Sequence, residues 1–154
     1  MCMKPFLIVI FIIVICACNN DPEKAERRDG FTAVLKDKED SLYHQVMEGH
    51  DIGMAKMGTL KKHMNRVARE LDSINRLPEK RVDQRRKQTL TALQEELNYA
   101  DHAMFTWMQE FNVDSAKSDK SKRLEYLESE KIKVLKVKRN ILNSLQRADS
   151  LFAK

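Results

Sequence analysis

Apolar residues recur in steps of three and four along most of the chain after residue 30, and this spacing places them on one face of an α-helix. No proline interrupts residues 31–77, and Pro78 ends this first segment. Its apolar face consists of Leu35, Leu42, Val46, Met57, Leu60, Met64, Val67, Leu71 and Ile74. Three glycines in its middle lower the helix propensity by about 1 kcal/mol each, so we expect a long first helix with a kink near residues 49–53.

Two further helices are expected, over residues 79–111 and from a cap at Asp119 or Ser121 to about Phe152. The second apolar face consists of Leu90, Leu93, Leu97, Ala100, Met104, Trp107 and Phe111. The third consists of Leu124, Leu127, Val134, Ile141, Leu145, Ala148 and Phe152. Because both connections are short, we predict that residues 31–154 form an all-α domain, an antiparallel three-helix bundle with long coiled-coil-like helices. A coiled-coil oligomer is the alternative.

The first 18 residues have the pattern of an export signal. Lys4 is the only charged residue before an apolar run at residues 6–15, which is too short to cross a bilayer as a stable helix. Residues 15–18 are an aliphatic residue, two small residues and a cysteine, and they resemble the lipobox of bacterial lipoproteins. The resemblance implies that residues 1–17 are a cleaved signal peptide and that Cys18 is acylated. An uncleaved anchor or a plain secretory signal is the alternative.

Lipidation would make membrane lipid a partner of the chain and would leave no free thiol, since the two other cysteines leave with the signal. Residues 18–30 then form a lipidated cysteine and a polar tether that cannot pack. Asp21 and Glu23 resemble the surface-export signals of Bacteroidota lipoproteins, and Asn19 favours the outer membrane. We therefore expect a lipid-anchored protein of the cell envelope, at the outer membrane, facing the periplasm or the cell surface.

Five of the eight methionines fall in two segments that the first hairpin would bring together, and they give a candidate metal site. Its residues are Met47, His50, Met54, Met57, Met104 and Met108. Thioethers and imidazole are soft ligands that suit Cu(I), and the hairpin register puts His50 near Thr106. The alternative is that the methionines fill irregular core space and pack on aromatic rings such as Trp107. His50 would then bond to a neighbour such as Asp51, and His102, off the apolar face, would point to solvent.

Positive charge gathers in residues 61–87, which hold ten Lys or Arg and only four Asp or Glu. This segment is the tip of the expected first hairpin, and Arg139, Arg147 and Lys154 are expected at the same end. A positive tip could bind an envelope protein or an anionic glycan. The candidate partner-binding residues are Arg81, Arg85, Arg86 and Lys87. A solvated, salt-bridged surface is the alternative. We expect no nucleic-acid partner, because export separates the protein from nucleic acid and no aromatic residues interleave the patch.

Catalytic motifs are missing from the sequence. The four histidines form no zinc-protease motif, the serines lack a nucleophile-elbow context, and the four scattered glycines exclude a glycine-rich phosphate loop. We therefore expect no catalytic activity, no cofactor apart from a possible Cu(I), and a monomer or weak homo-oligomer.

Two stretches and a later pair carry a family resemblance. They read His50-Asp51-x-x-Met54-x-x-Met57-Gly58, Asp101-x-x-Met104-x-x-Trp107-Met108-x-x-Phe111 and Tyr126-Leu127. Over residues 40–152 the chain resembles small Bacteroidota lipoproteins often labelled "viral A-type inclusion protein", a label that reflects coiled-coil similarity. The resemblance implies a helical architecture and a lipid anchor, but no functional residues. The expected function is therefore that of a membrane-anchored envelope lipoprotein with a structural or protein-interaction role, and copper handling is the alternative.

Overall fold

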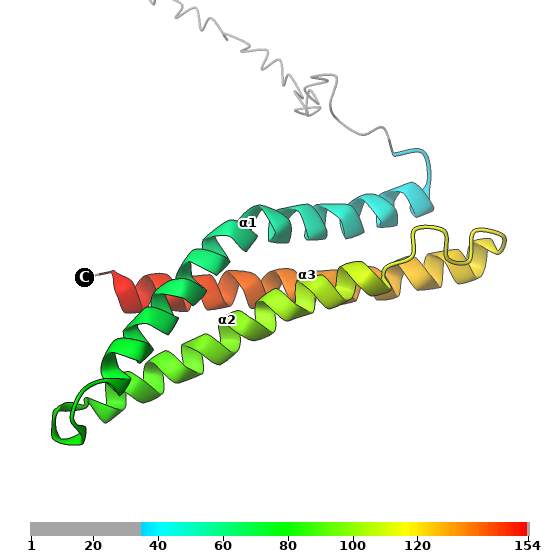
Figure 1. The fold of residues 1–154 in the computed structure, drawn as a ribbon. Helices are drawn as coiled ribbons and strands as arrows, with labels where there is room; N and C mark the ends of the chain where they lie inside the picture. Colours follow the sequence, from blue (N-terminus) through cyan, green and yellow to red (C-terminus); the bar gives the residue numbers. More distant parts are fainter. Residues whose placement is uncertain (1–34, 154) are drawn as a thin grey trace, which may run out of the picture. The chain divides into compact units, whose positions relative to one another are not determined.

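The computed structural model describes residues 35–153. The predicted signal peptide, Cys18 and most of the segment before the first helix lie outside the described residues, as does Lys154. The described part contains α1 (Lys38–Asn75), the short 3-10 helix η1 (Glu79–Arg81), α2 (Gln84–Glu110) and α3 (Lys120–Phe152), as Figure 1 shows. It contains no strand, so the prediction of an all-α domain is confirmed. None of its helices combines the length and the apolar character that crossing a membrane requires.

Aspartates cap all three α-helices. The side chains of Asp37, Asp83 and Asp119 each accept a hydrogen bond from a backbone N–H two or three residues later, at 3.0–3.2 Å. Such a cap satisfies an amide that has no partner within the helix. Asp119 is therefore the cap of the third helix. The second helix begins at Gln84 rather than near Glu79, because Asp83 supplies its cap and the preceding residues form η1.

One apolar core runs between the three helices, and each helix packs against the other two. The most deeply buried large side chains are Val46, Leu60, Val67, Leu90, Leu93, Leu97, Met104, Leu127, Val134 and Ile141. Each of them belongs to a predicted apolar face, so these three faces are confirmed at their centres. Leu35 differs from the prediction: it is 47% exposed, because it precedes the first turn of α1.

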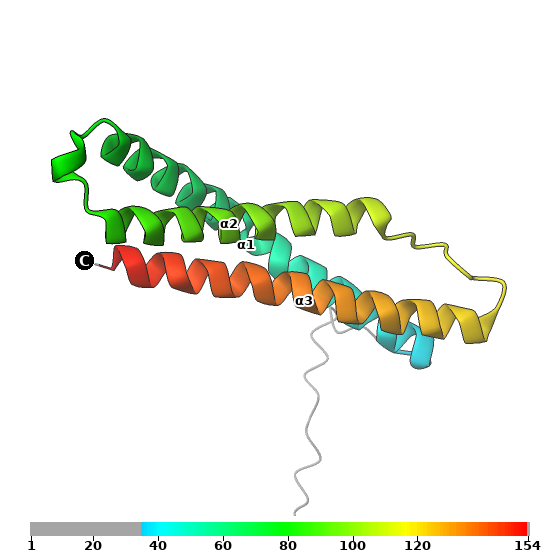
Figure 2. The same ribbon diagram turned by 90° about the horizontal axis from the view of Figure 1, so that it is seen from below.

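Polar contacts between the helices show which residues of one helix lie opposite which residues of another. α1 meets α3 through Asp37–Lys120, Glu39–Arg123 and His63–Asp149. α2 meets α3 through Glu96–Arg147 and Trp107–Glu130. The residue numbers rise together in the α1–α3 contacts, whereas they change in opposite directions in the α2–α3 contacts. Figure 2 shows α2 and α3 lying side by side, with α1 crossing them.

The glycines of α1 do not interrupt the helix, which is continuous from Lys38 to Asn75 and changes direction near its middle (Figure 1). Gly49 and Gly53 are both buried. A Cβ atom at Gly49 would lie 3.0 Å from Cγ1 of Val134 on α3, and one at Gly53 would overlap the terminal methyl of Met104 on α2. These two glycines therefore let α1 approach its neighbours closely, a role that the sequence analysis did not assign to them.

Arg123 at the start of α3 is a buried charged residue that the apolar pattern did not predict. It is only 3% exposed. Its Nε donates to Glu39 of α1 at 2.9 Å, and its Nη1 donates to the carbonyl oxygen of Ser115 at 2.9 Å. These bonds satisfy the guanidinium in place of water. Arg123 thus joins the first turn of α1 and the loop before α3 to the end of the core.

Candidate functional site

The candidate metal-binding methionines lie at different depths in the domain. Met104 is fully buried, Met47 and Met57 are half-buried, and Met54 and Met108 are 38% and 39% exposed. Met104 fills the space over Gly53, and Met57 packs against the edge of the core. The structure therefore gives two of these methionines a packing role.

His50 is held by its neighbours. Its Nδ1 lies 2.9 Å from a carboxylate oxygen of Asp51, and its ring centroid lies 5.6 Å from that of Trp107. The predicted bond to Asp51 is confirmed, and the facing residue on α2 is Trp107, one position from the expected Thr106. His102 is exposed, as predicted. Within residues 35–153, no group of three or more His, Cys, Asp or Glu side chains is arranged to hold a metal ion.

Met54 is 38% exposed, and one conservative variant there separates the packing hypothesis from the metal-binding hypothesis. Met54→Leu conserves volume at a partly exposed position, so it should change the free energy of unfolding by less than about 1.5 kcal/mol. A Cu(I) titration with a competing chelator, followed by Trp107 fluorescence, should show no stoichiometric binding to either protein. Stoichiometric binding that Met54→Leu abolishes without unfolding the domain would instead establish a copper site, because thioethers are suitable Cu(I) ligands.

Trp107 lies in a row of stacked rings that connects the three helices. Its ring centroid is 4.9 Å from that of Phe111, which is 6.2 Å from that of Tyr126 on α3. The Tyr126 hydroxyl accepts a hydrogen bond of 2.8 Å from the Asn112 backbone N–H, where α2 has ended. Together with His50, which lies beside Trp107, this aromatic row stabilises the end of the domain nearer the loop between α2 and α3.

A buried carboxylate is hydrogen-bonded to Trp107 of this row. Glu130 is 3% exposed, accepts a hydrogen bond of 3.0 Å from Nε1 of Trp107, and accepts another of 2.7 Å from Nζ of Lys133. The hydrogen bond to Glu130 is the main cause that raises the pKa of Lys133. The apolar pattern of the sequence does not reveal Glu130, because such a pattern marks only apolar residues as core positions.

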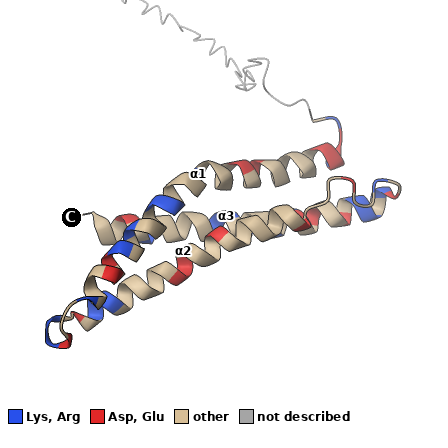
Figure 3. Ribbon diagram, in the orientation of Figure 1, with Lys and Arg blue, Asp and Glu red and all other residues tan. Residues whose placement is uncertain are grey.

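The opposite end of the domain carries a cluster of cations. We call the basic end the surface formed by Lys61, Lys62, Arg66, Arg69, Arg76, Lys80, Arg81, Arg85, Arg86 and Lys87. Figure 3 shows Lys and Arg along the second half of α1 and around its turn into α2. Arg81 lies in η1 and Arg85 in the first turn of α2, and both are exposed. Lys87 is half-buried.

Arg86 differs from the other candidate partner-binding residues, because the fold itself uses it. Its Nη2 lies 2.6 Å from Glu70, and its guanidinium lies 5.9 Å from the ring centroid of Phe152. Arg66 stacks over the same ring at 3.9 Å, and His63 stacks on it at 5.9 Å. These contacts hold the end of α3 against the other helices through cation–π attraction and an ion pair.

The two α3 cations expected at this end are placed differently. Arg147 forms an ion pair with Glu96 of α2, close to the contact between Asp149 and His63. Arg139 does not lie at the basic end, because nearby Ile141 packs at the level of Gly53, in the middle of α1. The prediction for Arg139 is therefore wrong. The last residue of α3, Phe152, lies beside His63 and Arg66.

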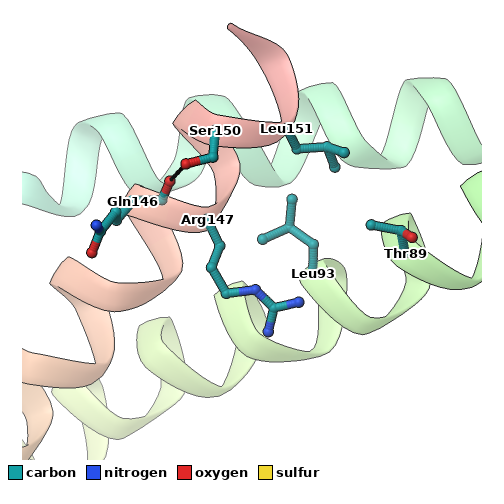
Figure 4. A pocket seen from close by; sticks show the side chains of 6 residues that line it. All are labelled: Thr89, Leu93, Gln146, Arg147, Ser150 and Leu151. Atoms are coloured by element: carbon teal, nitrogen blue, oxygen red, sulfur yellow. Dashed lines mark hydrogen bonds between the residues drawn. The ribbon is translucent and has the colours of Figure 1, made fainter.

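An open hollow lies on the seam between α2 and α3, and Figure 4 shows the side chains that line it. They are Thr89, Leu93, Gln146, Arg147, Ser150 and Leu151. The Ser150 hydroxyl donates to the Gln146 carbonyl oxygen at 2.8 Å. This lining contains neither a histidine nor a carboxylate, so it offers no side chain suited to act as a general base near neutral pH.

Comparison of the sequence with protein-family models finds no match, and comparisons with curated proteins and with solved structures find none either. The resemblance to Bacteroidota lipoproteins therefore stays a prediction.

Proposed function

We propose that this chain is a lipid-anchored protein of the bacterial cell envelope whose helical domain binds an anionic partner through its basic end and catalyses no reaction. In this proposal Cys18 carries the lipid, the outer membrane holds the anchor, and the domain is an antiparallel three-helix bundle that acts as a monomer or weak homo-oligomer. The lipobox pattern at residues 15–18 supports the anchor. The order of the contacts between α1, α2 and α3 supports the bundle.

One observation carries the binding proposal: four exposed cations of the basic end have no acidic partner within residues 35–153. Arg69, Lys80, Arg81 and Arg85 are exposed, and none of them forms an ion pair there. A group of uncompensated charges of one sign creates a potential that attracts anions and speeds their association. Because these side chains are exposed, the attraction should weaken as salt is added.

Charge reversal at two of these residues tests the proposal. The double variant Arg81→Glu with Arg85→Glu should weaken binding of polyglutamate, a soluble polyanion, by about tenfold or more, because two charges of the patch change sign. The matched control reverses Lys136 and Arg139, two exposed cations of α3 away from the basic end, and should leave binding within about twofold. Titration calorimetry at low salt on the fragment of residues 35–154 measures the affinity of the wild type and of each double variant for polyglutamate.

Two results would contradict the proposal. Equal losses in the two double variants would show that net charge, and not the basic end, governs binding. Absence of binding by the wild-type fragment would show that the exposed cations form only a solvated surface.

A further inference from the structure

The turn between α1 and α2 presents an apolar side chain among the cations of the basic end. Leu77 is 41% exposed and lies beyond the last core residues of α1, Leu71 and Ile74. We infer that the basic end docks on an anionic lipid surface, with Leu77 entering the headgroup layer and the surrounding cations contacting lipid phosphates. The inference rests on the proposed function and names its partner.

Backbone hydrogen bonds fix the turn on both sides of Leu77. The Leu77 N–H donates to the carbonyl oxygen of Ile74 at 3.1 Å, and the Arg81 N–H donates to that of Pro78 at 2.8 Å. The Arg76 N–H donates to that of Asp72 at 3.2 Å. Leu77 is therefore held at the end of the hairpin by a closed turn, and its exposure does not require a loose loop.

Most of the acidic residues among the cations of the basic end already have partners within the domain. Glu70 forms an ion pair with Arg86, Asp72 forms one with Arg76, and Asp83 caps α2. Three of the four acids in residues 61–87 thus have partners within the domain, either an arginine or a helix N-terminus. The cations without partners, among them Arg69, Lys80, Arg81 and Arg85, leave the outer surface positive. A cluster of this size is typical of segments that bind anionic membranes.

The exposure of Leu77 favours a lipid surface over other anionic partners. A soluble polyanion would use the cations alone, and Leu77 would stay in water. A lipid surface offers phosphates to the cations and, directly beneath them, an apolar layer to the leucine. The two attractions then act together at one place, which fits an apolar residue at the apex of a basic turn.

Vesicle binding by the fragment of residues 35–154 tests the inference. This fragment forms one compact unit that contains the whole described core, and circular dichroism should show that it and each variant are helical. We expect it to sediment with phosphatidylcholine vesicles that contain phosphatidylglycerol but not with phosphatidylcholine alone. About 0.5 M salt should release it, because the charges are exposed.

Two substitutions at Leu77 and one matched control test the apolar contact. Leu77→Ser should weaken vesicle binding by about fivefold or more and leave polyglutamate binding unchanged, because only the lipid surface takes up the side chain. Leu77→Trp should strengthen vesicle binding, since tryptophan favours the membrane interface. The control, Phe105→Ser, removes a side chain that is 53% exposed on α2 far from this turn, and it should bind vesicles as the wild type does.

The outcomes distinguish this inference from the proposed function. If the fragment binds polyglutamate but not the anionic vesicles, the inference that the partner is a lipid surface is wrong and the proposed function stands. If it binds neither, both are wrong. If Leu77→Ser and Leu77→Trp both bind vesicles as the wild type does, Leu77 does not enter the lipid and the inference is overturned.

Discussion

Replacing Glu130 by alanine is expected to lower the free energy of unfolding by about 3 kcal/mol. The change leaves the Nε1–H of Trp107 without an acceptor at a position that is 4% exposed, and an unpaired buried donor costs about 1–3 kcal/mol. It also removes one packed methylene group from a residue that is 3% exposed, which adds about 0.8 kcal/mol to the loss. Lys133 adds little to the loss, because its side chain is 53% exposed and returns to water.

A neutral substitution and a double-mutant cycle identify the cause of this loss. Glu130→Gln keeps an oxygen that can accept from Trp107, so it should cost less than about 1.5 kcal/mol. In a Trp107→Phe background no indole N–H remains to be orphaned, and Glu130→Ala should then cost about 1–2 kcal/mol less than in the wild type. Urea unfolding followed by far-ultraviolet circular dichroism gives the free energy of unfolding of the wild type and of each variant. If the glutamine and alanine variants are equally destabilised, the hydrogen bond to Trp107 does not stabilise this part of the core.

Glu130 also shows how far an apolar pattern can predict the core of α3. The buried positions of this helix include Arg123, Leu127, Glu130, Val134 and Val137, in steps of four and three. Leu127 and Val134 belong to the apolar face predicted from the sequence, because apolar side chains gain by leaving water. Val137 is buried as well but was not included in that face. The burial of Arg123 and Glu130 could not be predicted from the sequence, since a charged residue is buried only where partners replace its hydration. Those partners come from other helices, and their positions depend on the fold.

The regular spacing nevertheless contained a signal for the buried polar residues. Continuing the steps of four and three through α3 also reaches Ser144, which is 2% exposed. A face defined by spacing alone would have included all three polar residues. The spacing does not tell whether such a residue is buried with partners or turned to solvent. The hydrogen bond between Glu130 and Trp107 therefore could not be predicted from the sequence.

At the basic end the sequence showed the charge but not which charges remain available. The excess of Lys and Arg in residues 61–87 is visible in the composition of the segment. Arg86 was grouped with Arg81 and Arg85 because all three are close in sequence. In the structure Arg86 pairs with Glu70, sixteen residues away, and lies beside Phe152 at the end of α3. Sequence proximity cannot reveal a pairing that the turn between two helices creates.

The glycines of α1 give a second large expected effect, because the same substitution should act in opposite directions at two of them. Gly49→Leu is expected to lower the free energy of unfolding by about 3 kcal/mol, at the upper end of the cost of overpacking a core. A Cβ atom at this position would already lie 3.0 Å from Val134 Cγ1 and 3.5 Å from Leu135 Cδ2. Val134 is fully buried and β-branched, so it has little freedom to turn away. A whole leucine side chain would have to separate α1 from α3.

Gly58→Leu is the matched control on the same helix. Nothing lies within 4 Å of a Cβ atom built at Gly58, and the position is exposed. Leucine should therefore only raise the helix propensity there, which stabilises the domain by up to about 1 kcal/mol. Urea unfolding of each single variant measures the two opposite changes, and the free energies of unfolding of the two variants should differ by up to about 4 kcal/mol. If Gly49→Leu is also neutral or stabilising, α1 and α3 do not approach each other at Gly49, and low helix propensity is the only effect of these glycines.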